Sequence, residues 1–255
     1  MKALGVDVGG TGIKAAPVDL STGSFLREKS RIETPFLCTP EVLASTVKDF
    51  CKKFDWAGPV GIGFPGVIRH GCVQTAANLD HSWIGVPIEE FLSAKLSLPV
   101  SAINDADAAG LAEFQFGGGH KHTGLILFLT IGTGIGSALF YQGRLIPNTE
   151  LGHLPLHQAT AEKYASRRTK KKENLSWPEW GLRLNKYLSI LERTLTPDLI
   201  ILGGGASKKF SKYVNSLKLQ TPVKPAELLN RGGILGAALG VAEHPSSEVA
   251  LTSPS

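Results

Sequence analysis

One Gly-rich loop occurs twice in the chain, each time between two short apolar runs that are typical of buried strands. The first copy is Asp-Val-Gly-Gly-Thr-Gly at residues 7–12, and the second is Thr-Ile-Gly-Thr-Gly at residues 130–134. A Gly-rich turn between strands lets backbone N–H groups approach an anion closely. The repetition therefore predicts two half-domains that face each other across a cleft and bind phosphate between them.

Strands and helices alternate along the sequence, which predicts an α/β fold with a mainly parallel sheet. Strands are expected at residues 3–7, 12–18, about 25–32, 60–64, 99–103, 124–130, 135–141 and 199–202. Helices are expected at residues 40–54, 87–96, 106–116 and 179–195, from near Ser207, and at 232–243.

The order of these elements predicts two domains and a tail. Residues 1–107, with about 232–243, form the smaller α/β domain, and residues 108–231 form the larger one. Residues 244–255 are polar and contain two prolines, which predicts a disordered tail.

Composition restricts the class of protein. The chain has 255 residues, of which 42% are hydrophobic, so it can bury a substantial core. Its net charge of +5 favours an anionic partner without identifying one. The cysteines, Cys38, Cys51 and Cys72, are odd in number and lack CxxC spacing, which argues against a disulfide framework and a zinc knuckle. Since no signal peptide or membrane-spanning apolar run is evident, we expect a cytoplasmic protein without a membrane partner.

Asp105 is the candidate catalytic residue. It follows the predicted strand 99–103 almost directly, and ligands of open α/β sheets gather at the carboxyl ends of strands. A carboxylate there can accept the proton of a sugar hydroxyl as the hydroxyl attacks a phosphoryl group. The alternative is that Asp105 caps the N-terminus of helix 106–116, and the two roles are compatible.

Five motifs, in this order, resemble those of the ROK sugar kinases, within the hexokinase/actin-like ATPase superfamily. They are the first loop, Gly-Phe-Pro-Gly at 63–66, Asn-Asp-Ala at 104–106, the second loop, and Glu-Leu-Gly-His at 150–153. The resemblance covers about residues 2–243 and implies two actin-like (ribonuclease H-like) α/β domains flanking a cleft. Within the family, residues 104–113 and 175–180 look most like the polyphosphate/ATP glucokinases.

The resemblance assigns a role to each matching position. Asp105 would be the general base on the 6-hydroxyl of glucose, and Asp7 would position Mg²⁺. The sugar would be bound by Gly66, Asn104, Glu150, His153 and Glu162. Donor phosphates would be bound by Asp7, Gly9, Gly10, Thr11, Gly12, Lys14, Thr130, Gly132, Thr133, Gly134, Gly204 and Gly205.

The motif around His153 departs from the family pattern. Many ROK proteins bind a structural zinc through this histidine and three cysteines that follow it. No cysteine lies between His153 and Glu162, so we expect no zinc and assign His153 to the sugar. Its three-residue spacing from Glu150 would place both on one side of a helical turn. The alternative is a structural histidine bound to a backbone group.

Basic residues cluster after Glu162 and again after the Gly-rich segment 203–205. If both clusters flank one groove, they suit a long polyphosphate better than a compact nucleotide. The alternative is an ordinary solvated surface, and the chain shows no nucleic-acid-binding motif. The residues are Arg167, Arg168, Lys170, Lys171, Lys172, Lys208, Lys209 and Lys212.

The sequence therefore favours a glucokinase that uses polyphosphate, ATP or both, with Mg²⁺. The alternatives are a ROK kinase for mannose, fructose or N-acetylmannosamine, and a non-catalytic sugar-sensing ROK protein. The resemblance also implies a homodimer. Trp177 and Trp180 are expected in the core, and Trp83 near the sugar without a predicted contact.

Overall fold

The computed structural model describes residues 1–76 and 79–243, so the predicted tail 244–255 lies outside the described residues. The chain forms two compact units. Unit 1 comprises Met1–Ala108 and the chain from Gly233 onward, and unit 2 comprises Ala109–Gly232. No helix among the described residues is both long and apolar enough to span a membrane.

The sheet of unit 1 is mixed, so the expectation of a mainly parallel sheet is wrong for this unit. β1 (Lys2–Gly9) pairs antiparallel with β2 (Gly12–Asp19) and parallel with β5 (Val60–Phe64). β5 in turn pairs parallel with β8 (Val100–Asn104). The carboxyl ends of β1, β5 and β8 consequently lie along one edge of the sheet.

The strand expected at about 25–32 is two separate strands. β3 (Ser24–Phe25) and β4 (Ser30–Ile32) both pair with β2. Between them, Pro17 of β2 accepts a hydrogen bond from the Leu26 amide but has no N–H of its own to donate to that side. The ladder is interrupted there. A small hairpin, β6 (Ile68–Arg69) and β7 (Cys72–Val73), follows β5.

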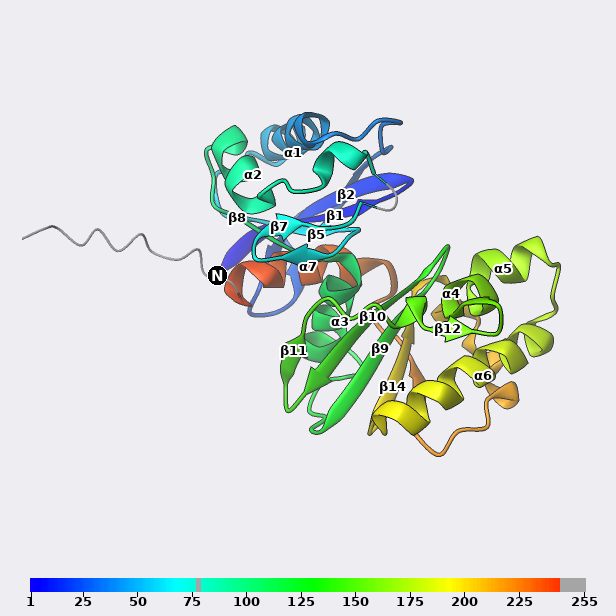
Figure 1. Ribbon diagram of the computed structural model, residues 1–255. Coiled ribbons are helices and arrows are strands. Elements are labelled where there is room, and N and C mark those ends of the chain that lie inside the picture. The colour runs from blue at the N-terminus through cyan, green and yellow to red at the C-terminus, as the bar shows by residue number, and fades with distance from the viewer. Residues whose placement is uncertain (77–78, 244–255) are drawn as a thin grey trace, which may run out of the picture. The chain divides into compact units, whose positions relative to one another are not determined.

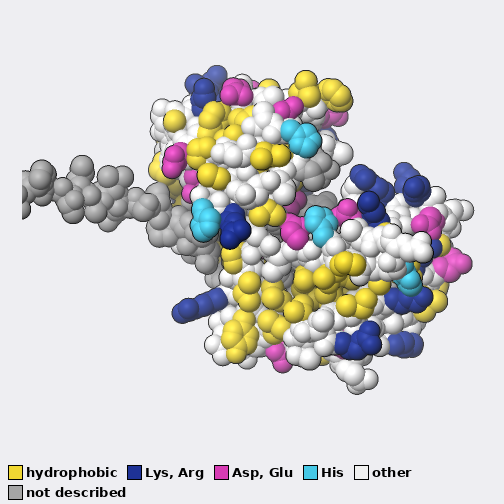
Figure 2. Space-filling view, viewed as in Figure 1, with side chains coloured by type: hydrophobic (Ala, Val, Ile, Leu, Met, Phe, Trp, Pro, Cys, Tyr) yellow, Lys and Arg dark blue, Asp and Glu magenta, His cyan; other side chains and the backbone are white. Residues whose placement is uncertain are grey.

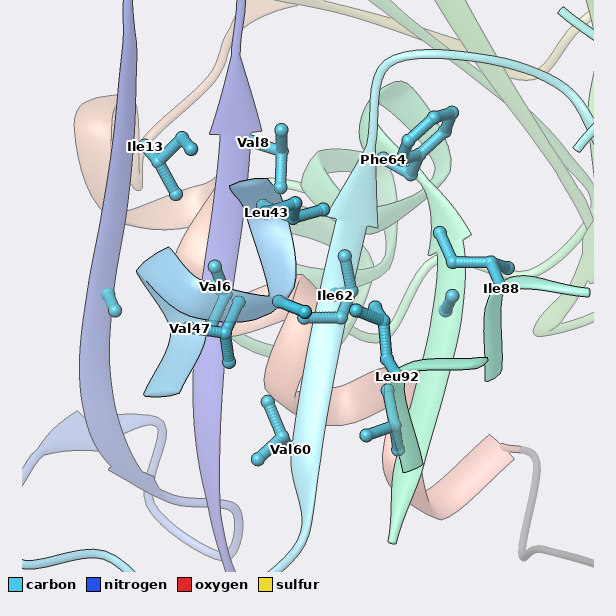
Figure 3. Packing of buried hydrophobic residues seen from close by; sticks show 14 of the residues in the cluster. Val6, Val8, Ile13, Leu43, Val47, Val60, Ile62, Phe64, Ile88 and Leu92 are labelled. Carbon is cyan, nitrogen blue, oxygen red and sulfur yellow. The ribbon is translucent and has the colours of Figure 1, made fainter. Parts of the chain in front are cut away.

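Helices cover both faces of this sheet (Figure 1). α1 (Pro40–Phe54) and α2 (Ile88–Leu96) pack on one face, where the apolar side chains of helices and strands interdigitate (Figure 3). Thr39 caps the N-terminus of α1, because its hydroxyl accepts a hydrogen bond from the amide of Val42. On the other face lie α7 (Gly232–Glu243) and the first turn of α3 (Asp105–Phe116).

Two glycines allow α7 to approach the sheet closely. A Cβ on Gly5 would lie 2.0 Å from the carbonyl oxygen of Ile234, and one on Gly61 would lie 1.8 Å from that of Ala237. Both distances are far below van der Waals contact. Any larger residue at either position must therefore displace the helix backbone.

Unit 2 is built on a second mixed sheet, of order β11-β10-β9-β14-β15. β10 pairs antiparallel with β9 and β11, whereas β14 pairs parallel with β9 and β15. The strands are β9 (Leu125–Ile131), β10 (Ile135–Tyr141), β11 (Arg144–Ile146), β14 (Leu199–Gly203) and β15 (Val223–Pro225). A short hairpin, β12 (Pro155–Leu156) and β13 (Ala159–Thr160), precedes the helices.

α6 (Trp177–Leu195) packs its apolar side against this sheet, and a capping box between Ser176 and Glu179 sets its start. α4 (Ala161–Ala165) and α5 (Arg167–Lys172) precede it. On the opposite face, Gly110 of α3 packs against side chains of β9 and β10.

The helix expected from near Ser207 is instead a 3₁₀ segment, Gly204–Lys212, with non-helical backbone at Lys209. The tryptophan predictions have mixed outcomes. Trp180 is fully buried, as expected, but Trp177 is only half-buried. Trp83 is also fully buried, between Phe64 and Phe91. Its indole N–H donates to the Cys38 carbonyl at 2.8 Å, so Trp83 is a core residue of unit 1.

The glycine contact with α7 can be tested within one strand. Gly61→Ala should lower the free energy of unfolding by about 3 kcal/mol or more, because its Cβ meets backbone that no rotamer change relieves. Gly63→Ala is the matched control, since the nearest atom to its Cβ would be 3.5 Å away. Urea titration of both variants measures the difference. Equal stabilities would contradict the close approach of α7.

Candidate functional site

In unit 1, the predicted site residues gather at the carboxyl edge of the sheet. The turn Gly10–Thr11 joins β1 to β2, and the segment through Gly66 follows β5. In the sheet register, Asp7 is paired with Gly63, and Phe64 with Asn104. The strand order thus brings together motifs that are far apart in the sequence.

Asn104 connects two of these motifs. Its buried side-chain Oδ1 accepts the amides of Ala106 at 2.8 Å and Asp107 at 3.2 Å, and its Nδ2 donates to the Gly66 carbonyl at 3.1 Å. The N-cap of α3 is therefore Asn104. The alternative role considered for Asp105, that of capping this helix, is thus taken by its neighbour. Asp105 is the first residue of the helix. Asn104 retains one side-chain N–H for a ligand.

The predicted metal residue, Asp7, forms an ion pair. Its Oδ2 lies 3.0 Å from the Nζ of Lys14, with 19% of the Asp7 side chain exposed. A Cβ on Gly233 would lie 2.8 Å from the Asp7 carboxyl carbon, so the start of α7 packs directly on this carboxylate. Lys14, expected to bind phosphate, is thus already paired.

In unit 2, the second Gly-rich loop is joined to α5. The Gly132 amide donates to the Gly134 carbonyl at 2.9 Å, which closes the turn. The Gly132 carbonyl accepts the amides of Arg167 at 3.0 Å and Arg168 at 3.3 Å. The predicted basic run consequently begins on the loop itself.

Gly204 and Gly205, which are also expected to bind donor phosphates, lie against the same part of unit 2. Arg167 donates from Nη1 to the Gly205 carbonyl at 2.9 Å. Gly204, with a φ of 68°, packs so closely on Ile131 that a Cβ would lie 2.9 Å from its backbone nitrogen. Arg167 therefore links the loop at 130–134 to the one that follows β14.

The predicted sugar residues of unit 2 form a second cluster. Glu150 directly precedes the 3₁₀ turn Leu151–His153, and its Oε2 lies 3.8 Å from the Nδ1 of His153, the last residue of that turn. Glu162 accepts the Ile135 amide through Oε2 at 3.0 Å, which fixes it beside the loop. Burial raises the pKa of Glu150, His153 partly offsets this, and the charge of Glu162 raises that pKa further. His153 and Glu162 thus both act on the Glu150 carboxyl.

The basic residues differ in their availability. The Arg167 guanidinium and the Lys170 ammonium lie over the Trp177 ring, 5.5 and 4.7 Å from its centroid, and Lys170 also donates to the Leu175 carbonyl. Figure 2 shows Lys and Arg side chains gathered on the part of unit 2 that carries α5. The exposed members are Arg168, Lys171, Lys172, Lys208, Lys209 and Lys212.

Sequence reasoning missed Arg31 and Thr34. Arg31 donates from Nη2 to the Thr11 carbonyl at 2.7 Å, and the Thr34 hydroxyl donates to the Gly9 carbonyl. No motif marks either residue, because both reach the first loop only through the pairing of β4 with β2. Across residues 1–76 and 79–243, no group of three or more His, Cys, Asp or Glu side chains is arranged to hold a metal ion.

Comparisons with known proteins agree with these features. The model of the ROK family matches residues 3–165. The polyphosphate glucokinase of Mycobacterium tuberculosis (strain H37Rv) is 46% identical over 236 residues, covering 92% of this chain and 89% of that protein. The polyphosphate glucokinase of Mycobacterium leprae is 43% identical, covering 93% of this chain and 74% of that protein.

Solved structures extend the similarity to the fold. The inorganic polyphosphate/ATP-glucomannokinase from Arthrobacter sp. strain KM is 44% identical, with a TM-score of 0.90 over 95% of this chain and 99% of that one. A ROK family glucokinase from Streptomyces griseus shares the fold at 24% identity, with a TM-score of 0.80 over 93% of this chain and 98% of that one. The expected two-domain actin-like α/β fold is confirmed, and this chain belongs to the ROK family.

Proposed function

We propose that this protein is a glucokinase that transfers a phosphoryl group from polyphosphate, ATP or both to the 6-hydroxyl of glucose. The observation that carries the proposal is the placement of Asp105 at the carboxyl edge of the sheet, with the capping role taken by Asn104. The likeness to the polyphosphate glucokinases, over nearly the whole of both chains, supports the same activity.

In this mechanism, Asp105 accepts the proton of the 6-hydroxyl as its oxygen attacks the terminal phosphorus of the donor. Glu150, His153 and Glu162 hydrogen-bond other hydroxyls of the sugar, helped by the remaining N–H of Asn104 and by the Gly66 segment. Such pairs of donors and acceptors match the adjacent hydroxyls of a pyranose ring.

Backbone groups bind the donor phosphates at the two Gly-rich loops. Both loops leave N–H groups close to the surface, because glycine has no side chain that would cover them. Gly204 and Gly205 complete the donor site of unit 2, where Arg167 holds their segment against the loop at 130–134.

Asp7 is a suitable ligand for Mg²⁺. Proteins commonly hold this ion through one or two carboxylates together with substrate phosphates and water, so a single carboxylate beside a phosphate loop fits. Bound there, Mg²⁺ would neutralise charge on the donor phosphates. The ion pair with Lys14 holds the Asp7 carboxylate in position.

Polyphosphate is the donor best suited to the exposed cations of α5. The helix begins on the Gly132 carbonyl, so phosphates that extend beyond the loop would meet Arg168, Lys171 and Lys172. Arg167 and Lys170 instead lie over the Trp177 ring. We therefore leave these two residues out of the polyphosphate groove expected from the sequence.

Mannose is a second candidate acceptor, because the similar Arthrobacter enzyme is named a glucomannokinase. We further propose that the enzyme is cytoplasmic, where ATP is plentiful, and a homodimer, as the family resemblance implies.

The function is tested by a coupled assay of hexose 6-phosphate, with glucose or mannose as acceptor and ATP or polyphosphate as donor. Asp105→Asn should lower kcat by about 10²–10⁴-fold, because an amide cannot take the proton. Glucose binding should persist. The control is Asp49→Asn, an exposed carboxylate of α1 in the same unit. Near-normal turnover of Asp105→Asn would exclude general-base catalysis by this residue.

Glu150→Gln should have opposite effects on function and stability. It should raise the glucose KM by about tenfold, the low end for a charged hydrogen bond, because Glu150 is partly exposed. Yet the Tm should rise near pH 7, since a carboxyl whose folded pKa is raised destabilises the fold once ionised.

The pH dependence supplies the check on this prediction. The Tm difference between Glu150→Gln and the wild type should vanish below the ordinary glutamate pKa of 4.5 and grow as pH rises through the raised folded pKa. Calorimetric scans of both proteins at roughly unit steps from about pH 4 to about pH 8 measure this Tm difference. A variant less stable than the wild type at pH 7 would contradict the electrostatic account.

Lys171→Ala combined with Lys172→Ala should raise the polyphosphate KM much more than the ATP KM, because a long chain contacts more cations. The polyphosphate KM should also depend less on salt in this variant. The control is the double variant Lys48→Ala with Lys52→Ala, which removes two positive charges from exposed positions of α1. Equal impairment of both donors, or of neither, would mean that these lysines are ordinary surface residues.

A further inference from the structure

Three charged side chains form a row across the sheet of unit 1, beside the first Gly-rich loop. In the strand register, Asp7 of β1 is opposite Lys14 of β2, and Lys14 is opposite Arg31 of β4. Directly opposed residues of antiparallel strands project from the same face. Asp7 and Lys14 neutralise each other, so Arg31 gives the row its net positive charge.

The Arg31 guanidinium lies over the turn that follows β1. Its Nη2 donates to the Thr11 carbonyl at 2.7 Å. A Cβ on Gly12 would lie 2.5 Å from Nε and 2.8 Å from Nη2, so the guanidinium occupies space that only glycine leaves open. Arg31 is nevertheless exposed, and no carboxylate among the described residues forms an ion pair with it.

This placement leaves most of the guanidinium N–H groups available. One N–H is used by the Thr11 carbonyl, and the rest of the planar fork remains for another acceptor. The fork matches two oxygens of a phosphate, to which arginine commonly binds in a bidentate manner. The bond to Thr11 also covers a carbonyl dipole that would otherwise repel an anion at the turn.

On the basis of the proposed function, we propose that Arg31 binds phosphate groups of the phosphoryl donor at the turn between β1 and β2. The turn supplies backbone N–H groups, and Arg31 supplies a positive charge that has no carboxylate partner among the described residues. Lys14 cannot supply it, because Lys14 is paired with Asp7. The ligand class is a chain of linked phosphates, as in polyphosphate or the triphosphate of ATP.

The test separates binding from turnover. Titration calorimetry with tripolyphosphate and with long-chain polyphosphate, without sugar, measures donor affinity directly. Arg31→Gln should weaken both by about tenfold, near the low end for a charged hydrogen bond because the site is exposed. Arg31→Lys should lie between, since it keeps the charge but loses the fork. Arg27→Gln, an exposed arginine before β4, should bind like the wild type.

The salt dependence of binding distinguishes direct phosphate binding by Arg31 from a purely structural role at the turn. For long-chain polyphosphate, Arg31→Gln should reduce the slope of log K against log salt by roughly one, because one fewer phosphate is neutralised. If Arg31 only supports the turn, that slope will not change even if the Tm falls. An unchanged slope would therefore overturn the proposal, whether or not the affinity falls.

Gly12→Ala provides a second, independent variant. Its Cβ should push the guanidinium off the turn and weaken tripolyphosphate binding in the wild type, but add little in the Arg31→Gln background. Fully additive losses would contradict the placement of the guanidinium over Gly12, on which the proposal depends.

The outcomes also distinguish this proposal from the proposed function. If the wild type phosphorylates no hexose yet binds polyphosphate in an Arg31-dependent way, the kinase assignment fails and the phosphate contact stands. If the wild type is an active kinase and all Arg31 variants bind both phosphate chains normally, the contact alone fails.

Discussion

The contact of α7 with the sheet of unit 1 is the constraint on which the first half of the molecule depends. Gly5 and Gly61 lack the side chains that would hold the helix away, so its backbone rests directly on β1 and β5. The same approach brings Gly233, at the start of α7, against the carboxylate of Asp7. A packing requirement of the core therefore also determines the surroundings of a charged group at the edge of the sheet, because both arise from one helix in one position.

Much of the site is organised by side chains that hold backbone, rather than by side chains that face a ligand. Asn104 connects the start of α3 to the segment after β5, and Arg167 connects the two Gly-rich segments of unit 2. Glu162 holds the amide of Ile135 beside the second loop. Such bonds fix the position of exposed N–H groups in the absence of a ligand, so less conformational entropy would be lost if phosphates bind there as proposed. The partly buried carboxyl of Glu150 has a destabilising effect instead, because burial raises its pKa and its ionisation therefore lowers the stability of the fold.

Many local elements could be predicted from spacing and composition. The helix at 40–54 occurs as expected, because its cap, its proline and its apolar periodicity act over a few residues. The Gly/Ala-rich helix at 232–243 occurs as expected too. The strand at 25–32 and the helix from Ser207 were wrong. Pro17 of the preceding strand β2 interrupts the first, and the second forms a 3₁₀ segment packed on Ile131. The basic run is evident in the sequence, but its pattern could not reveal that Trp177 engages Arg167 and Lys170.

The sequence by itself determined the α/β class, the two Gly-rich loops, the order of the ROK motifs and the residue types available for chemistry, because each is a local pattern. Only the tertiary structure decided which groups meet. It gave the cap of α3 to Asn104, paired Lys14 with Asp7 and laid Arg31 over the first turn. The contacts of Lys14 and Arg31 join residues that separate strands bring side by side, and a pairing register between strands leaves no mark in the spacing of either strand alone.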